Sequence, residues 1–352
     1  MTLHVDILLS FLWAFMISVF AIPSIVRVAH VKNLLDEPNF RTVHASLTPR
    51  LGGLAIFAGF MSAITIFGDI NHSIQRVLAG CMVLFFIGLK DDIISISVFK
   101  KFFVQVLATG IIMFIGDIRI TSFQGFLGIH ELEDGISYGI TFLVVVGITN
   151  AINLIDGLDG LAGSIIMIIT LVFGYYFYIS TSAEFHPYAK LAICLVGGIV
   201  GFLRYNMHKA IIFMGDTGSL VCGFLVAVLA IQFIEMRSVP AAPSLAVATL
   251  IIPVFDTARV FAVRILRGLS PFSPDKNHIH HILMRMGLNQ LQTVLVLVVC
   301  NIVAVVIATT FAHLGDNWLR LVIGIVFLLS RIFLALVVRK HRIVQPQASP
   351  QE

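Results

Sequence analysis

Two long apolar runs, 136–148 and 161–179, are interrupted by the short polar stretch Asn150-Ala-Ile-Asn153-Leu-Ile-Asp156-Gly-Leu-Asp159-Gly160. Acids in a membrane-like setting are costly unless something pairs with them, so the default interpretation is a functional site. Asp156 and Asp159 are three residues apart and share one face if the turn stays helical. The alternative is a plain helical hairpin, in which Asp and Asn cap the helices and Gly makes the turn.

A second acidic pair, Asp91-Asp92, ends another apolar run and is followed by Lys100-Lys101. Adjacent side chains on a helix lie about 100° apart, so both acids face one site only near a helix end. Acids at the C-terminus of a helix oppose the helix dipole, which indicates a cation nearby. A solvated pair in a loop is the alternative interpretation.

The segment Phe213-Met-Gly215-Asp216-Thr217-Gly218-Ser219 opens a further apolar run and is typical of a helix start. Free backbone N–H groups at such a start attract phosphate. Thr217 or Ser219 taken alone is explained equally well as an ordinary N-cap. The complete Gly-Asp-Thr-Gly sequence favours a phosphate-binding site.

Histidines and basic residues gather in one later loop, which contains Arg264, Arg267, Lys276, His278, His280 and His281. Three histidines within four residues resemble a metal-binding tract. The i, i+4 spacing or the cysteines of a soft-metal site are missing from this loop. We therefore interpret these residues as donors to an anionic substrate, with one histidine as a candidate acid or base.

Two further features leave alternatives open. The first basic loop, which contains His44, contacts either lipid headgroups in general or a phosphate-carrying lipid substrate. Asp256 and Arg259 lie i, i+3 inside an apolar run, so they form either an internal ion pair or part of a catalytic site.

Carboxylates without cysteine partners indicate a hard cation, Mg²⁺ or alternatively Mn²⁺, that holds a pyrophosphate. A metal surrounded by basic side chains suits phosphoryl transfer, because catalysis there is mostly positioning and charge neutralisation. A site at a membrane surface favours a lipid phosphate as the acceptor. The four cysteines lie inside apolar runs without paired spacing, and they predict neither a disulfide nor a metal site.

The elements that must position these residues are membrane helices. The chain has 352 residues, of which 58% are hydrophobic and only 12% charged, and this excludes a soluble globular protein. We predict an all-α polytopic integral membrane protein with about eleven transmembrane helices. These cover roughly 5–28, 52–69, 74–90, 101–116, 137–155, 161–180, 187–204, 218–235, 244–262, 291–312 and 318–338. The first is too long for a signal-peptide core, so we expect it to be retained.

Alternate connections between these spans differ in charge. One side holds Lys32, Arg41, Arg50, Lys90, Lys100, Lys101, Arg204, Lys209, Arg264, Arg267, Lys276, Arg285, Arg339, Lys340 and Arg342. The other side holds only Arg76, Arg119, Lys190, Arg237 and Arg320. The positive-inside rule makes the first side cytoplasmic, with the N-terminus outside (periplasmic) and the C-terminus inside. All the motifs above then lie at the cytoplasmic face.

The chain is expected to form a single transmembrane domain, 1–344, followed by a disordered tail, 345–352. The alternation over 118–123, in the longest outer connection, predicts a small hairpin. We expect the membrane to be a partner and nucleic acid not to be one.

Taken together, the motifs resemble one known family. Asp91-Asp92, the stretches 150–160 and 213–219, and His278-Ile-His280-His281 follow the order found in the polyprenyl-phosphate N-acetylhexosamine-1-phosphate transferases, the superfamily of the MraY and WecA types. The resemblance covers nearly the whole chain. The stretch Ser270-Pro-Phe-Ser-Pro-Asp275 is similar to that of WecA-type enzymes, which use UDP-GlcNAc.

This resemblance implies transfer of GlcNAc-1-phosphate from UDP-GlcNAc to undecaprenyl phosphate, with release of UMP. The product would be undecaprenyl-diphosphate-GlcNAc, the primer for O-antigen or a related surface glycan, and thus a step of lipopolysaccharide synthesis. The family setting also implies the bacterial inner (cytoplasmic) membrane, a homodimer, and Mg²⁺ as the cofactor.

The resemblance also assigns roles to residues. Asp216 would ligate Mg²⁺, and Asp91 and Asp92 would serve the lipid phosphate and the metal, one of them as a base. Asn153, Asp156 and Asp159 would hold the nucleotide side. His278, His280, His281 and Arg264 would hold the diphosphate and the sugar. Lys101, four residues before Gln105, would contact a phosphate. The remaining predicted substrate-binding residues are His44, Asn150, Arg267 and Lys276.

Other functions stay open beside this one. An ion-coupled transporter also uses intramembrane acids, but on broken helices near the bilayer midplane and often in repeated halves. A catalytically silent scaffold of the same fold is a second rival. Within the enzyme interpretation, the donor is UDP-GlcNAc or another UDP-N-acetylhexosamine such as UDP-GalNAc. A direct attack by the lipid phosphate and a covalent aspartyl intermediate are both compatible with the sequence.

Overall fold

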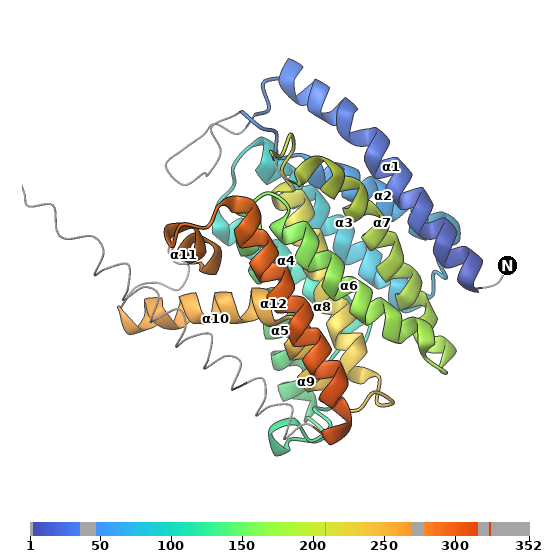
Figure 1. Cartoon of the computed structure of the whole chain (residues 1–352). Coiled ribbons are helices and arrows are strands. Elements are labelled where there is room, and N and C mark those ends of the chain that lie inside the picture. Colours follow the sequence, from blue (N-terminus) through green and yellow to red (C-terminus); the bar gives the residue numbers. More distant parts are fainter. Residues whose placement is uncertain (1–2, 36–46, 208, 269–277, 316–323, 325–352) are drawn as a thin grey trace, which may run out of the picture.

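The computed structural model describes residues 3–35, 47–207, 209–268, 278–315 and 324 (Figure 1). Regular structure in this part of the chain is helical. The long helices are α1 Leu3–Val31, α2 Gly52–Phe67, α3 His72–Ile93, α4 Val98–Gly110, α5 Asp134–Ile155, α6 Leu161–Ile179, α7 His186–Asn206, α8 Gly215–Glu235, α9 Ala242–Thr249, α10 Ile251–Leu266, α11 Ile279–Arg285 and α12 Gln290–Phe311. Short turns of helix are η1 Ile111–Ile115, η2 Phe126–Gly128, η3 Ala183–Phe185 and η4 Ala312–Leu314.

The chain is a polytopic membrane protein. In its described part, eight helices are long and apolar enough to cross a membrane, or nine if α9 and α10 count as one span. The shorter apolar helix α2 covers the second predicted span, and α4 with η1 covers the fourth. The last predicted span, 318–338, and the tail fall almost wholly outside the described residues.

The ninth predicted span, 244–262, is not one straight helix. It breaks at Leu250 into α9 and α10, which are bent by 76°. Pro253 explains the break, because it has no N–H to donate to the carbonyl of Thr249. The amide of Asn301 on α12 donates to that carbonyl instead, at 3.4 Å. In Figure 1, α10 accordingly crosses the direction of the other long helices.

Helix α8 forms the centre of the bundle. Within its membrane-length window 94% of the residues are buried, as expected for a helix that is apolar on all sides. It packs against α2, α3, α5, α6 and α9. Close approach at its first turn requires glycines on two neighbours: a Cβ on Gly53 would lie 2.1 Å from the Gly218 nitrogen, and one on Gly88 would lie 2.6 Å from the Thr217 Cα. The start of α8 is therefore fixed tightly between α2 and α3.

The connection between η1 and α5 contains the small hairpin suggested by the alternation over 118–123. It has one isolated antiparallel bridge, between Ser122 and Glu131. Thr121 donates from its N–H and its hydroxyl to the carboxylate of Glu235, at 2.7 Å each. The hairpin therefore binds the C-terminal end of α8, whereas the polar motifs surround its N-terminal end.

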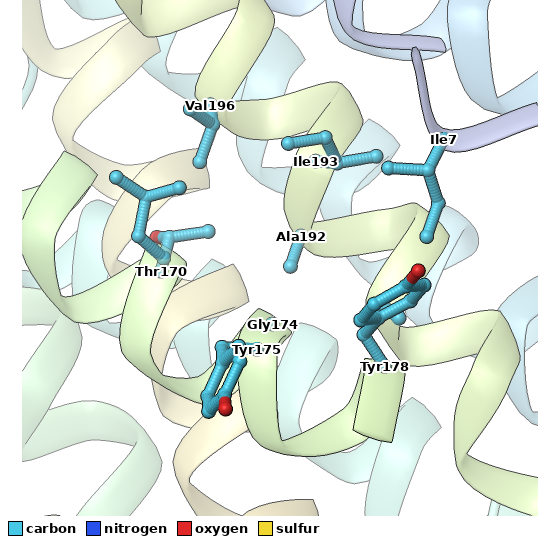
Figure 2. A pocket seen from close by; sticks show the side chains of 10 residues that line it. Ile7, Thr170, Gly174, Tyr175, Tyr178, Ala192, Ile193 and Val196 are labelled. Atoms are coloured by element: carbon cyan, nitrogen blue, oxygen red, sulfur yellow. The ribbon is translucent and has the colours of Figure 1, made fainter. Parts of the chain in front are cut away.

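An apolar pocket of about 170 Å³ lies between α1, α6 and α7 (Figure 2). Its lining includes Ile7, Thr170, Tyr178 and Ile193 and no charged side chain. Tyr178 lies in the last turn of α6, at the end remote from Asp156. The lining of this pocket therefore offers hydroxyl groups but no charged side chain for a phosphate or a metal.

Candidate active site

Two carboxylates converge on one ammonium group at the start of α8. Asp91, in the last turn of α3, and Asp216, in the first turn of α8, both contact Nζ of Lys101, in the first turn of α4. The Nζ–Oδ2 distances are 2.6 Å to Asp91 and 2.5 Å to Asp216. The three side chains are 14–23% exposed, so a solute can reach the cluster. The two acids thus point at the same small volume, and a cation occupies it.

Asp92 has a different role from its neighbour. Its Oδ1 accepts a hydrogen bond from the Asp216 N–H at 2.8 Å, and its Oδ2 accepts from the N–H of Thr217 at 2.9 Å. The Thr217 hydroxyl donates to the same Oδ2. Asp92 therefore satisfies free N–H groups of the α8 N-terminus, where a negative charge is stabilised by the helix dipole. Both acids reach the site because α3 ends at Ile93.

The loop before α8 is held by backbone hydrogen bonds from the first turn of α2. Gly52 N–H donates to the Phe213 carbonyl and Gly53 N–H to the Met214 carbonyl, at 2.8 Å each. Gly215 has φ of +71°, and a Cβ there would lie 2.0 Å from the Arg50 carbonyl oxygen and 2.7 Å from the Asp92 carboxylate. Only glycine fits this left-handed, crowded position. The turn at Gly215 consequently fixes the position of Asp216 in the cluster.

The two asparagines of α5, Asn150 and Asn153, hydrogen-bond to different parts of the site. Asn153 donates to Asp216 Oδ1 at 3.3 Å and to the Ser219 hydroxyl at 2.7 Å, so it belongs to the acidic cluster. Asn150 lies one turn earlier and exchanges hydrogen bonds with the Gln105 amide, at 2.7 and 3.3 Å. This second pair joins α4 to α5 and thereby fixes Lys101, which lies one turn from Gln105.

Asp156 and Asp159 do not share a face, because α5 ends at Ile155 and Asp156 leaves helical geometry. The pKa of the Asp156 carboxyl is raised well above its ordinary range by burial, and the negative charges of Asp216 and Asp92 raise it further. Asp159 is 5% exposed, and its Oδ2 accepts from the Ala210 N–H at 3.0 Å. Asp156 therefore interacts electrostatically with Asp216 and Asp92 of the acidic cluster. Asp159 instead connects the turn to the segment that precedes α8, through its hydrogen bond with Ala210.

The histidine loop lies against the same turn. His280 is 2% exposed, and its Nε2 lies 3.0 Å from where a Cβ on Gly157 would be. Burial, together with the neighbouring His281, lowers the pKa of His280 to about 3. The rings of His278 and His280 are stacked with centroids 5.7 Å apart, and the His281 ring lies 4.3 Å from that of His280. The predicted histidines and the Asp156 turn are thus brought together.

The remaining predicted residues are placed less centrally or not at all. Arg264 is buried in the last turn of α10, and Arg267 at the end of that helix is exposed. His44 and Lys276 lie outside the described residues. Their assignment as substrate contacts stays a prediction.

Comparison with known proteins decides the family. The model of glycosyl transferase family 4 matches residues 74–234. A probable undecaprenyl-phosphate N-acetylglucosaminyl 1-phosphate transferase of Bacillus subtilis is 31% identical, over 96% of this chain and 94% of that protein. The undecaprenyl-phosphate alpha-N-acetylglucosaminyl 1-phosphate transferase of Escherichia coli K12 is 31% identical over 92% and 88%, and that of Salmonella typhi is 30% identical over 84% and 82%. The chain belongs to this family of sugar-1-phosphate transferases. It is therefore a membrane-bound phosphotransferase.

The donor set of the transferase fits a hard divalent cation. Asp91 and Asp216 each direct a carboxylate oxygen at the Lys101 ammonium, which holds a positive charge where a metal ion would sit. In the described residues, no group of three or more His, Cys, Asp and Glu side chains forms a ready metal site. Mg²⁺ suits such a place, because it is usually held by one or two carboxylates together with water and substrate phosphates. Asp92, the second predicted ligand, uses both oxygens on the start of α8.

Sequence reasoning left three contributors to the transferase site without a role. Ser219 receives the Asn153 amide, Gln105 pairs with Asn150, and Gly157 makes room for His280. The i, i+4 spacing of Lys101 and Gln105 is the one local signal among them. The other two depend on contacts between segments distant in the sequence.

Proposed function

We propose that this transferase moves GlcNAc-1-phosphate from UDP-GlcNAc to undecaprenyl phosphate and releases UMP. The Bacillus subtilis and Escherichia coli relatives are named as undecaprenyl-phosphate N-acetylglucosaminyl 1-phosphate transferases, and this chain matches 94% and 88% of their length. The observation that carries the proposal is the convergence of Asp91, Asp216 and Lys101 beside the α8 N-terminus. Phosphoryl transfer is promoted by fixed acids that can hold a cation together with a positive side chain that can contact a phosphate. The first N–H groups of α8 do not add to this, because Asp92 accepts their hydrogen bonds.

In this proposal Asp216 and Asp91 hold Mg²⁺, with Mn²⁺ as the alternative. When bound, the ion would neutralise the diphosphate of the donor while the bond between its two phosphates breaks, UMP leaves, and the lipid phosphate becomes bonded to the sugar phosphate. The Lys101 ammonium is then free to contact a phosphate. Asp92 keeps the α8 N-terminus in place, and Asn153 orients Asp216 through its amide.

The histidine side of the site is proposed to bind the donor. His278 caps α11 and His280 and His281 lie in its first turn, and His280 lies against Gly157 in the turn of Asp156. Asn153, Asp156 and Asp159 would hold the nucleotide, and Arg264 with the histidines would hold the diphosphate and the sugar. The charged guanidinium of Arg264 can donate hydrogen bonds to phosphate oxygens, whereas a neutral imidazole donates through one nitrogen and accepts through the other.

The membrane arrangement follows from charge. We propose that the acidic cluster faces the cytoplasm of a bacterium, in its inner membrane, because the basic connections lie on that side of the spans. The N-terminus would then be periplasmic, and the product would serve O-antigen or a related surface glycan. A homodimer remains a prediction from the family resemblance.

A transporter is less compatible with the positions of the acids. Asp91 lies in the last turn of α3 and Asp216 in the first turn of α8, at helix ends and not at mid-span. Carboxylates at helix ends suit a reaction at the membrane surface, whereas coupling ions bind near the bilayer midplane.

Purified protein in detergent would be supplied with undecaprenyl phosphate, Mg²⁺ and single UDP-sugars, and UMP release followed. UMP from UDP-GlcNAc, lost on adding EDTA, is the expected result. UMP from UDP-GalNAc instead would change the donor and keep the reaction. Absence of UMP with every donor, in protein shown to be folded by its size-exclusion profile and thermal midpoint, would overturn the proposal in favour of a silent scaffold.

A further inference from the structure

Asp256 lies on α10, outside the acidic cluster, and it makes a contact that the mechanism above does not use. Its Oδ2 lies 2.8 Å from Nδ1 of His278, and its Oδ1 accepts from the Ile279 N–H at 2.9 Å. Arg259, one turn further along α10, donates from Nη2 to Oδ1 at 3.1 Å. The Asp256 side chain is only 1% exposed. The ion pair expected from the i, i+3 spacing is present, but the carboxylate also holds the start of the histidine loop.

A carboxylate beside Nδ1 determines which nitrogen of the ring carries hydrogen. An ionised carboxylate only accepts hydrogen bonds, so Nδ1 of His278 must be the protonated nitrogen. Nε2 is then the nitrogen left for a substrate. The same second partner fixes the tautomer and ring orientation of many functional histidines.

The fold explains why this carboxylate is available. Pro253 breaks the ninth span and starts α10, which packs against α5. Asp256 therefore lies in the helix that follows the break. From His278 the contacts continue to the stacked His280 ring and to Gly157.

We infer that Asp256 is a positioning residue of the transferase: it fixes His278 with hydrogen on Nδ1 and presents Nε2, as a hydrogen-bond acceptor, to a hydroxyl group of the donor's sugar. The identity of that donor rests on the proposed function. The orientation of His278 by Asp256 does not.

Three variants separate this role from a structural one. Asp256→Asn keeps the shape and an acceptor for the Ile279 N–H, but its amide can donate to Nδ1 and so favours hydrogen on Nε2. His278→Gln removes the ring. Arg259→Gln is the matched control, because it removes the ion pair and leaves the contact between Asp256 and His278. Each is purified as the full chain, with folding checked by thermal midpoint.

UMP release gives the first readout. We expect Asp256→Asn to lower kcat/KM about 10- to 100-fold, the range for outer partners of functional histidines. Asp256→Asn combined with His278→Gln should be no slower than His278→Gln alone, because the carboxylate acts only through the ring. In Arg259→Gln, kcat/KM should fall less than in Asp256→Asn, because Asp256 keeps its contact with His278, while loss of this buried ion pair should lower the thermal midpoint. Additive losses, or a loss in Arg259→Gln equal to that in Asp256→Asn, would overturn the inference.

¹⁵N NMR of histidine-labelled protein gives a readout that needs no substrate. The signals that disappear in His278→Gln identify the ring, and they should show hydrogen on Nδ1 in the wild type and on Nε2 in Asp256→Asn. Hydrogen on Nε2 in the wild type would contradict the inference, even if Asp256→Asn failed to fold. If the wild type releases no UMP, the proposed function fails, while the NMR result still decides the role of Asp256.

Discussion

The two ends of the bundle each hold a lysine between two carboxylates, and their surroundings differ. At one end Lys101 contacts Asp91 and Asp216. At the other end Lys190 of α7 contacts Asp6 of α1 at 3.0 Å and Asp69, after α2, at 3.0 Å. Helix α2 separates the ends, since Gly53 in its first turn meets the start of α8 and Asp69 follows its last turn.

The ion pairs alone do not distinguish a site from a clamp. The Lys190 side chain is 5% exposed and joins three segments, so it packs as a structural contact. Lys101 is 23% exposed and lies beside the first N–H groups of α8, with Asn153 on the second oxygen of Asp216. The access for solute and the fixed position of the Asp216 carboxylate make the first cluster suitable for chemistry. This difference predicts activity losses at one end and stability losses at the other.

Asp216→Asn should produce the largest effect. The amide keeps the volume but removes the charge that would hold a cation, so kcat should fall at least about 10³-fold, on the scale of losing a main electrostatic group in an active site. UMP release with saturating UDP-GlcNAc measures it. The matched control is Asp69→Asn at the other end, expected within about threefold of wild type. Equal losses in both variants would remove the distinction between the two clusters.

Lys190→Met should mainly change stability. It leaves Asp6 and Asp69 without their shared cation, and it should cost about 3 kcal/mol of unfolding free energy, the lower end for breaking a buried pair because Asp69 is half exposed. The thermal midpoint in detergent would fall, and kcat of the remaining folded protein would stay near wild type. Lys101→Met is the counterpart and should lose activity with a smaller shift in the midpoint. The reverse pattern would contradict the assignment of site and clamp.

Acid should destabilise the histidine side of the site. The pKa of His280 is about 3 in the folded state and about 6.5 when unfolded, so the unfolded state binds more protons between these values. Stability is therefore lost as pH falls below about 6.5, by about 2 kcal/mol between pH 6.5 and pH 5. Thermal midpoints against pH test this: His280→Gln should flatten that part of the curve, and exposed His130→Gln in the outer hairpin should not.

Gly157→Ala should have the smallest effect. Its Cβ would lie 3.0 Å from Nε2 of His280, so the ring must shift by a few tenths of an ångström. We expect kcat/KM to fall about tenfold, as for a small misplacement of a positioned group. Gly139→Ala on the outer half of α5, where a Cβ meets nothing within 4 Å, is the control and should be neutral. An unchanged rate in Gly157→Ala would show that the His280 contact with the turn is unimportant.

Much of the membrane architecture was predictable because it depends on local composition. The lengths of the apolar runs predict the positions of α1 to α8 and of α12. The acids at the ends of these runs indicate the cluster of Asp91 and Asp216. Hydropathy did not predict the break in the ninth span, since it does not register the hydrogen bond that Pro253 cannot make. It also counted Lys190 as an outer charge, although its two carboxylate partners come from other segments.

The site was predictable in its residue types and less so in its contacts. Asp91 and Asp92 are adjacent in sequence, yet Asp91 contacts Lys101 and Asp92 accepts hydrogen bonds from the N-terminus of α8. Both lie in the last turn of α3, and the chain becomes extended at Ile94. Asp156 and Asp159 separate because α5 stops at Ile155. The contact of Asp256 with His278 spans 22 positions, and no local pattern encodes it.

The most direct test of the account is the Mg²⁺ dependence of UMP release in wild type, Asp91→Asn and Asp69→Asn. The account predicts that Asp91→Asn raises the half-saturating Mg²⁺ concentration by about tenfold or more, since one of two converging carboxylates is lost, while Asp69→Asn leaves it unchanged. An unchanged Mg²⁺ dependence in Asp91→Asn, with normal folding, would contradict the claim that the Asp91–Lys101–Asp216 cluster is the cation site of the transferase.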